Sequence, residues 1–107
     1  MITMMIRYKG ENGNAKRFAE EMRESGTVDL IRKEEGNLRY EYYYSAEDPE
    51  TVLLIDSWKD EKALEIHHAS QMMNTITALR EKYDIRMEAE RYTDEIVPES
   101  DERFIRR

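Results

Sequence analysis

Two neighbouring strand patterns near the middle of the chain limit its possible folds most strongly. Over residues 37–45, side chains alternate as in a strand that packs on one face. One face carries Leu38, Tyr40, Tyr42 and Tyr44. A short turn at 46–50 leads into an apolar strand over 51–57, which favours a hairpin. Because this second strand is apolar on both faces, and the helices of one chain cover only one, we expect a second copy of the chain on the other.

The remaining elements complete the order of strands and helices. They are predicted as a strand over 2–8, a helix from Asn14 that is weakened at Gly26 and stops at Gly36, two nearly continuous helices after Asp60 and Ser70, and a strand over 85–93. The order βαββαβ is typical of the α+β ferredoxin-like fold, a four-stranded antiparallel sheet with helices on one face. We predict one domain over 1–93. The charged tail over 94–107 either packs on the partner chain or is disordered.

Length and composition argue against several classes of protein. At 107 residues the chain is one domain, small enough to gain from oligomerisation. Charged residues make up 38% of it and the net charge is -7, which argues against nucleic acid or a membrane surface as partner. There is no cysteine for a disulfide or a thiolate metal site, and no apolar run long enough for a signal peptide or a membrane span. The sequence predicts a cytoplasmic protein.

Residues 53–70 hold the only tryptophan and both histidines of the chain. Trp58 ends the second hairpin strand, and Asp60 is placed to cap a helix that carries His67, so we expect Trp58 and His67 to face one space. With an ordinary pKa near 6.5, His67 in an apolar pocket could accept a phenolic proton. The alternative is a histidine at the edge of the core, hydrogen-bonded to the backbone. His68 points about a hundred degrees away, so the pair is a poor metal site and no metal is expected.

Four further side chains are candidates for the lining of a pocket. They are Phe18, Met72 and Met73 on predicted apolar helix faces, and Tyr42 in the tyrosine row of the first hairpin strand. Each has a structural alternative, because such faces usually form core, although methionine also adapts well to flat aromatic ligands. Trp58 also has more than one possible role. It could be a flat wall against an aromatic ligand, part of the core, or both.

Two motifs resemble those of a known family. One is Trp-Lys-Asp-x-x-Ala-Leu-x-x-His-x-Ala-Ser over 58–70, and it is preceded by Glu-Gly-Asn-Leu-Arg-Tyr-Glu-Tyr over 35–42. Over roughly residues 2–93, the chain resembles the antibiotic biosynthesis monooxygenases of the quinol monooxygenase type. The resemblance implies that two ferredoxin-like sheets pair into a dimeric α+β barrel. It also implies oxidation of a hydroquinone or related polycyclic aromatic phenol, with dioxygen as co-substrate and no cofactor.

The same resemblance implies roles for the candidate residues. It makes His67 the base. The substrate contacts would be Trp58, Phe18, Tyr42, Met72 and Met73. The alternative is a non-enzymatic homodimer that binds a small apolar or aromatic ligand. An open pocket between Trp58 and His67 would favour the enzyme, and a filled core there would favour the binding protein. Haem degradation is not favoured, because residues 70–83 lack the axial histidine that haem-degrading relatives of this fold have there.

Overall fold

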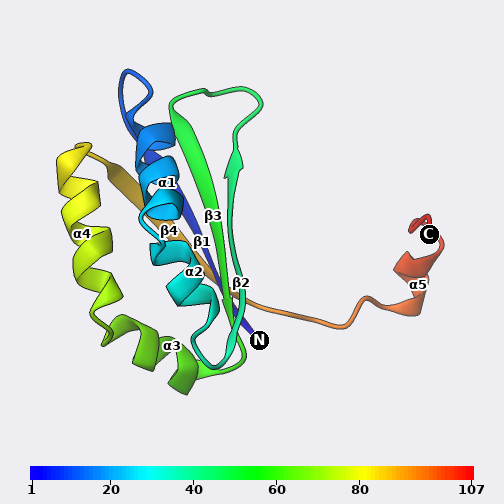
Figure 1. The fold of residues 1–107 in the computed structure, drawn as a ribbon. Coiled ribbons are helices and arrows are strands. Elements are labelled where there is room, and N and C mark those ends of the chain that lie inside the picture. Colours follow the sequence, from blue (N-terminus) through cyan, green and yellow to red (C-terminus); the bar gives the residue numbers. More distant parts are fainter.

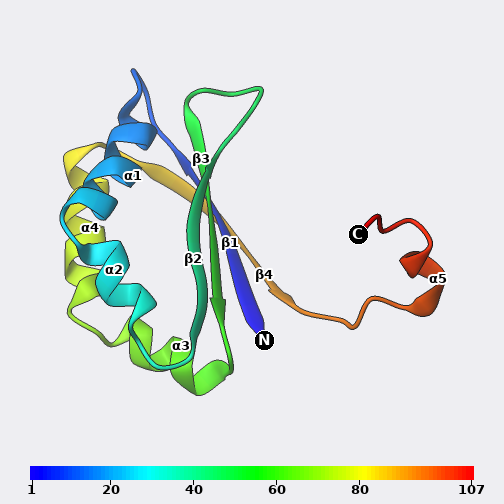
Figure 2. The same cartoon turned by 45° about the vertical axis from the view of Figure 1, so that its right-hand side comes forward.

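The computed structural model describes residues 1–107 and has one antiparallel sheet with helices on one face (Figure 1). The strands are β1 (Ile2–Lys9), β2 (Asn37–Tyr44), β3 (Thr51–Trp58) and β4 (Arg86–Thr93), in the order β2-β3-β1-β4. The helices are α1 (Asn14–Glu24), α2 (Thr27–Arg32), α3 (Glu61–His68), α4 (Met72–Lys82) and α5 (Glu99–Glu102). Figure 2 shows α1 to α4 on the same side of the sheet. The predicted ferredoxin-like fold is confirmed.

Strand β3 lies inside the sheet, between β2 and β1. The side chains on its helix-facing side are almost fully buried, and they are Val52, Leu54, Asp56 and Trp58. Leu53 and Ile55 alternate with them and are partly buried on the opposite, open face. In the ladder, Asp56 lies opposite Met4 of β1 and Tyr40 of β2. A carboxyl group therefore sits in the middle of the covered side of the sheet.

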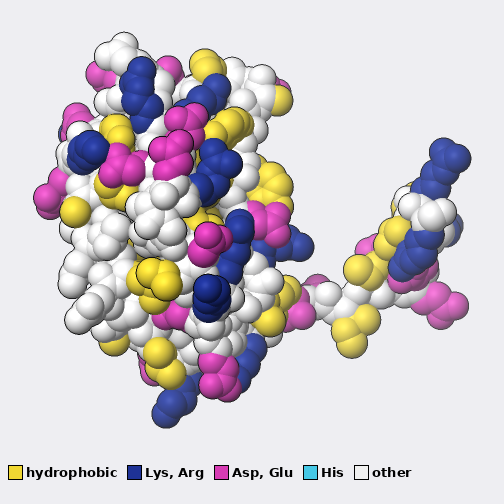
Figure 3. All heavy atoms as spheres, in the orientation of Figure 1, with side chains coloured by type: hydrophobic (Ala, Val, Ile, Leu, Met, Phe, Trp, Pro, Cys, Tyr) yellow, Lys and Arg dark blue, Asp and Glu magenta, His cyan; other side chains and the backbone are white.

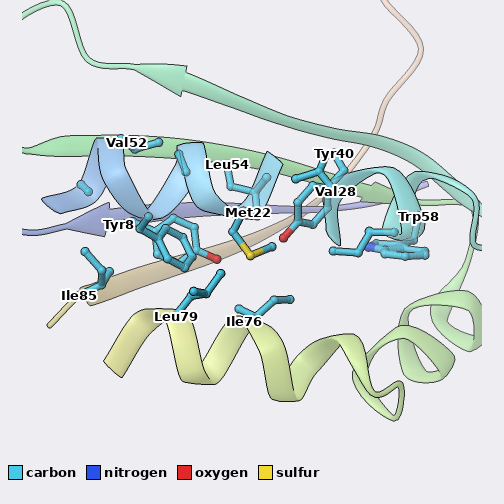
Figure 4. Close-up of a cluster of buried hydrophobic side chains, with 14 of the residues drawn as sticks. Tyr8, Met22, Val28, Tyr40, Val52, Leu54, Trp58, Ile76, Leu79 and Ile85 are labelled. Atoms are coloured by element: carbon cyan, nitrogen blue, oxygen red, sulfur yellow. The ribbon is translucent and has the colours of Figure 1, made fainter. Parts of the chain in front are cut away.

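The core lies between the sheet and the helices (Figure 4). On α1 the helical spacing puts four apolar side chains on the buried face, and these are Ala15, Phe18, Ala19 and Met22. Burial of a large apolar side chain stabilises a fold by about 1.5–3 kcal/mol. Figure 4 shows Tyr8 and Tyr40 pointing from the sheet toward α4, which carries Ile76 and Leu79. Two hydroxyl groups thus reach into this mostly apolar layer.

Two local details differ from the prediction. Gly26 does more than weaken the first helix, because its φ of 82° is a left-handed conformation that divides the helix into α1 and α2. In β2 the register shifts between Asn37 and Arg39. As a result Leu38 is 56% exposed and does not share the buried face with Tyr40 as predicted.

The turn between α2 and β2 packs against α3. The predicted helix stop at Gly36 lies beyond the observed end of α2 at Arg32. Gly36 has a φ of 87°, and a Cβ atom there would lie 2.6 Å from the Cβ of Ala63. Glycine therefore permits this close approach, which also brings Glu34 of the same turn to α3.

The tail after Thr93 leads away from the domain in both ribbon views. Asp94 pairs with the N-terminal ammonium group at 3.1 Å. Every residue from Asp94 to Arg107 is exposed, including Phe104 at 76%. Figure 3 shows this segment as an arm that carries both apolar and charged side chains. Its packing on a partner chain stays a prediction.

Candidate active site

Two local rules bring the candidate residues together. Side chains alternate along β3, so Asp56 and Trp58 share its buried face. Asp60 begins α3 as predicted, because its Oδ1 accepts a hydrogen bond from the Ala63 N–H at 2.9 Å. His67 follows Ala63 by four residues and lies on the same buried face of the helix. The strand and the helix that follows it therefore present their polar side chains to one layer.

A series of contacts runs from Asp56 to Glu34 within this layer. The Nε1–H of Trp58 donates to Oδ1 of Asp56 at 2.7 Å. The indole stacks on the imidazole of His67, with ring centroids 4.6 Å apart and planes inclined by 27°. Nδ1 of His67 lies 2.7 Å from Oε2 of Glu34 in a further hydrogen bond. Side chains from β3, α3 and the turn before β2 are thus joined in one network.

His67 is placed to accept a proton inside the protein. It is 2% exposed, and its partner Glu34 has a side chain that is 14% exposed. Burial lowers the pKa of His67, and the Glu34 carboxylate offsets this effect in part. The ring is therefore neutral at neutral pH, with Nδ1–H donating to Glu34 and the lone pair on Nε2. Nε2 has no hydrogen-bond partner in the chain.

Asp56 has a buried carboxyl group and is not among the predicted site residues. It is 4% exposed. Burial raises the pKa of Asp56 from 3.8 to about 7, while the hydrogen bond from Trp58 opposes this rise and the charge of Glu34 adds to it. Near neutral pH the carboxyl group therefore populates both protonation states. The alternation of β3 is the signal that could have found it, since Val52, Leu54 and Trp58 define the buried face on which it falls.

A cavity of about 140 Å³ lies between the sheet and the helices α3 and α4. Its wall is mostly apolar, with Leu54, Met73 and Ile76 among the lining residues. The polar side chains that reach it are Tyr8, Tyr40, Asp56, His67, His68 and Arg80. Ligand pockets commonly measure roughly 300–1,000 Å³, so this one suits a small ring system. An apolar pocket on which a few titratable groups converge is the usual form of an active site.

The structure places His67 and Met73 at this cavity, but it places Trp58 behind His67. Trp58 is fully buried and is absent from the cavity wall. The two stacked rings leave no open space between them, which is the filled core that the sequence associates with a binding protein. His68 is exposed, as expected, and also lines the cavity. Trp58 can therefore influence the site through the two side chains that it contacts, Asp56 and His67.

The other three predicted lining residues lie outside the cavity wall. Phe18 is fully buried, with its ring centroid 4.8 Å from that of Tyr8, and Met72 is partly buried against the core. Tyr42 packs beside Tyr8 and Tyr40, and its hydroxyl group is buried without a hydrogen-bond partner. Phe18 and Met72 thus pack in or against the core, which is the structural alternative to a place in the pocket lining.

A larger hollow of about 560 Å³ lies on the surface. It is lined by Tyr42, a predicted ligand contact, and by Tyr44, Arg23, Arg32 and Glu41. Apart from Tyr42, these residues are exposed. The Nε and Nη2 groups of Arg32 already donate to the carbonyl of Tyr40, at 3.0 and 2.8 Å. This hollow lacks the buried acid and base of the smaller cavity, which is therefore the stronger candidate.

The structure has neither a clustered set of metal ligands nor a membrane-spanning helix. No group of three or more His, Asp or Glu side chains is arranged to hold a metal ion. None of the helices combines the length and the apolar character that crossing a membrane requires.

The match of a protein family identifies the fold and the motif around α3. The family model described as antibiotic biosynthesis monooxygenase matches residues 1–79. This chain belongs to the antibiotic biosynthesis monooxygenase family. The match includes Glu34, Asp56, Trp58 and His67, so the series of contacts from Asp56 to Glu34 lies within the matched residues. A search of curated proteins finds no significant match.

Solved structures have the same fold as this family member. A conserved protein from Methanosarcina mazei is 24% identical, with a TM-score of 0.75, and the match covers 88% of this chain and 92% of that one. A Pseudomonas aeruginosa protein is 21% identical, with a TM-score of 0.75 and coverage of 89% and 94%. SnoaB from Streptomyces nogalater, described as a cofactor-independent oxygenase, is 14% identical, with a TM-score of 0.74 and coverage of 90% and 94%. At these identities the likeness shows the fold alone.

Proposed function

We propose that this protein is a cofactor-independent monooxygenase that oxidises a hydroquinone or related polycyclic aromatic phenol with dioxygen. The observation that carries the proposal is His67, a buried neutral histidine at an apolar cavity, with Nδ1 bonded to Glu34 and Nε2 free. Membership of the family supports the reaction class, and SnoaB, which has the same fold, is described as a cofactor-independent oxygenase. The cavity volume favours the smaller ring systems among these phenols.

In this reaction the substrate supplies the electrons. Nε2 of His67 takes the phenolic proton, and the resulting anion passes one electron to dioxygen. The two radicals combine into a hydroperoxide on the ring, which loses water to give the quinone. For a hydroquinone, one dioxygen is consumed, and one hydroxyquinone and one water are formed. The protein contributes by orienting the ring in an apolar space and by holding the proton.

Glu34 has a positioning role in this mechanism. Its carboxylate fixes the tautomer of His67, because Nδ1–H donates to it and Nε2 is left as the acceptor. When Nε2 takes a proton, the same carboxylate stabilises the imidazolium ion at hydrogen-bond distance. A buried histidine without such a partner would be a weaker base, because burial alone disfavours its charged form.

The second candidate is a non-enzymatic homodimer that binds a small apolar or aromatic ligand. One observation favours it: Trp58 and His67 stack directly, and no open pocket separates them. A protein of this kind would bind aromatic molecules in the cavity without accelerating their reaction with dioxygen. Measurement of turnover therefore separates the two candidates.

We also infer that two chains pair through the open face of the sheet. Leu53 and Ile55 form a partly buried apolar centre on this face, and Met5 of β1 lies opposite Ile55 in the ladder. No helix of the chain covers this face (Figure 2). The tail then provides a second contact, because Phe104 and Ile105 are exposed on an arm that extends beyond the domain.

The test of the function is dioxygen uptake with a panel of reduced quinols and anthrones prepared without oxygen. We expect uptake well above the autoxidation blank for at least one compound. His67→Gln should lower that rate by roughly a hundredfold, which is typical for loss of a general base. Glu65→Gln, an exposed change on the same helix, is the matched control and should keep the rate. No acceleration by the wild type, together with tight binding of the same compounds, would favour the binding protein.

A further inference from the structure

Asp56 meets the cavity with one carboxyl oxygen that the chain leaves unpaired. Its Oδ1 accepts the hydrogen bond of the Trp58 indole at 2.7 Å, whereas no donor of the chain is bonded to Oδ2. Asp56 is buried and lines the cavity, so the natural partner for Oδ2 is a molecule bound inside it. Because polar atoms inside a protein are normally hydrogen-bonded, this carboxyl oxygen is available for a contact with a molecule in the cavity.

We propose that Asp56 is a second acid–base residue of the site and removes the proton from the ring carbon that carries the hydroperoxide. This assignment rests on the proposed monooxygenase function and extends it. The reaction needs two proton acceptors, since one proton leaves a phenolic oxygen before dioxygen reacts and another leaves the ring carbon afterwards. His67 on α3 and Asp56 on β3 supply one acceptor from each wall of the cavity.

The protons and electrons balance with these two residues. His67 takes the phenolic proton, the anion gives one electron to dioxygen, and the radicals join as a ring peroxide. The protonated His67 returns its proton to the peroxide, which becomes a hydroperoxide. Asp56 takes the ring hydrogen as a proton, the C–H electron pair forms the carbonyl, and the O–O bond breaks to release hydroxide. The proton on Asp56 then converts hydroxide to water, and both residues regain their starting states.

The other groups around Asp56 are less suited to this step. The titratable and charged groups facing it are Glu34 from the turn before β2, Tyr8 from β1, Tyr40 from β2, His67 and His68 from α3, and Arg80 from α4. Burial raises the pKa of Tyr8 and Tyr40, so both keep their protons. An arginine does not release its proton, Glu34 is occupied by His67, and His68 is exposed to solvent. Burial brings the pKa of Asp56 to about 7, where proton exchange is easiest.

The role of Asp56 is tested by measuring dioxygen uptake and product formation separately, with naphthohydroquinone as the probe. Monooxygenation gives hydroxynaphthoquinone and water, whereas autoxidation gives naphthoquinone and hydrogen peroxide, so the products identify the route. The variant is Asp56→Asn, whose amide oxygen can still accept from Trp58 Nε1 but whose side chain cannot take a proton. Glu65→Gln on the outer side of α3 is again the control.

We expect the wild type to form one hydroxynaphthoquinone for each dioxygen. In Asp56→Asn, initial dioxygen uptake should persist, while hydroxynaphthoquinone formation slows by at least tenfold and an organic hydroperoxide accumulates. Product formed at the wild-type rate in Asp56→Asn would overturn the role of Asp56 and leave the monooxygenase function intact. A wild type that consumes no dioxygen beyond the blank with naphthohydroquinone or with any compound of the quinol and anthrone panel would instead overturn the proposed function, and this assignment with it.

The protonation state of Asp56 gives a second test that needs no substrate. A protonated carboxyl group has an infrared C=O band, and ordinary Asp and Glu side chains lose it well below neutral pH. We expect one band in the wild type that disappears with a midpoint near pH 7 and is absent from Asp56→Asn. Glu34→Gln should keep the band at slightly lower pH, because the Glu34 charge raises the pKa of Asp56. A wild type without such a band above about pH 6 would contradict the assignment.

Discussion

The pKa values of titratable residues are shifted by different causes on the two faces of the sheet. On the helix-covered face, burial is the largest cause of the shifted pKa of both Asp56 and His67. On the open face, Arg7 and Glu90 form an ion pair that reaches solvent, and the largest cause of each shifted pKa is the partner's side chain. A partner holds a group in its charged form, whereas burial favours the neutral form. Groups that exchange protons near neutral pH are therefore expected on the covered face only.

The largest effect expected from this difference is on the pH dependence of stability. The folded state raises the pKa of Asp56 from 3.8 to about 7, so its contribution to stability is present below pH 3.8 and is lost as the pH rises through 7. The shift corresponds to about 4 kcal/mol. We expect Asp56→Asn to gain several kcal/mol of stability relative to the wild type between about pH 4 and pH 8. Urea unfolding followed by the fluorescence of Trp58, the only tryptophan, measures it.

His67 provides the control with the opposite sign. Its pKa is lowered by burial, so its contribution is present above the ordinary value of 6.5 and is lost as the pH falls through the lower folded-state value. In His67→Gln, stability relative to the wild type should therefore rise as the solution becomes more acidic. If the stability of the wild type and of both variants changed with pH in the same way, burial would not control the pKa values of Asp56 and His67.

Residues of the covered face illustrate how much of the fold and of the site could be predicted from the sequence. The fold follows from short-range periodicity, because the alternation over 37–45 indicates a strand and the spacing on α1 indicates a buried helix face. His67 was identified because residues 53–70 hold both histidines of the chain, and because the resemblance to the family makes this one the base. Asp56 was missed because one acidic residue among apolar neighbours has no motif, and its burial depends on strands on both sides of it.

Other details depended on contacts between distant segments. The pairing of Glu34 with His67 joins positions 33 residues apart and requires the close packing of Gly36 against α3. The outward position of Leu38 results from a register shift that the alternation of its own strand does not reveal. The stacking of Trp58 on His67 places the indole behind the base and leaves it outside the cavity wall. Periodicity thus predicted the elements, whereas the site depended on how they pack.

The second-largest effect is expected on the open face, where we expect Ile55→Lys to convert a dimer into a monomer. Ile55 is partly buried at the centre of this face, and a lysine there would place two charges in an apolar interface related by symmetry. In the monomer the lysine faces water, so the fold should be kept. Sedimentation should give the mass of two 12.9 kDa chains for the wild type and of one for the variant. Circular dichroism should show the same secondary structure in both.

A charge change away from this face separates interface disruption from the effect of added charge. Glu65→Lys, on the exposed side of α3, changes the net charge in the same direction and should leave the dimer intact. A wild type that sediments as a monomer, or Ile55→Lys that remains a dimer, would show that the open face is not the site of association.

The smallest effect is expected for the ion pair at the edge of the open face. Arg7→Gln removes the partner of Glu90, but both side chains reach solvent, where such pairs contribute little to stability. We expect unfolding curves that coincide within error. The pKa of Glu90 should rise toward its ordinary value, because the hydrogen bond and charge of Arg7 lower it in the wild type. Titration of the Glu90 carboxyl by NMR measures this shift.

The outcome of this last change distinguishes a solvated pair from one that a partner chain covers. If dimerisation buries the pair, removal of Arg7 leaves an unpaired carboxylate in the interface and weakens association, while unfolding of the isolated domain is unchanged. If the pair stays in solvent in the dimer, neither quantity changes and only the pKa of Glu90 responds. Comparison of Arg7→Gln alone with Arg7→Gln in the Ile55→Lys background separates these cases, because the second variant has no interface to weaken.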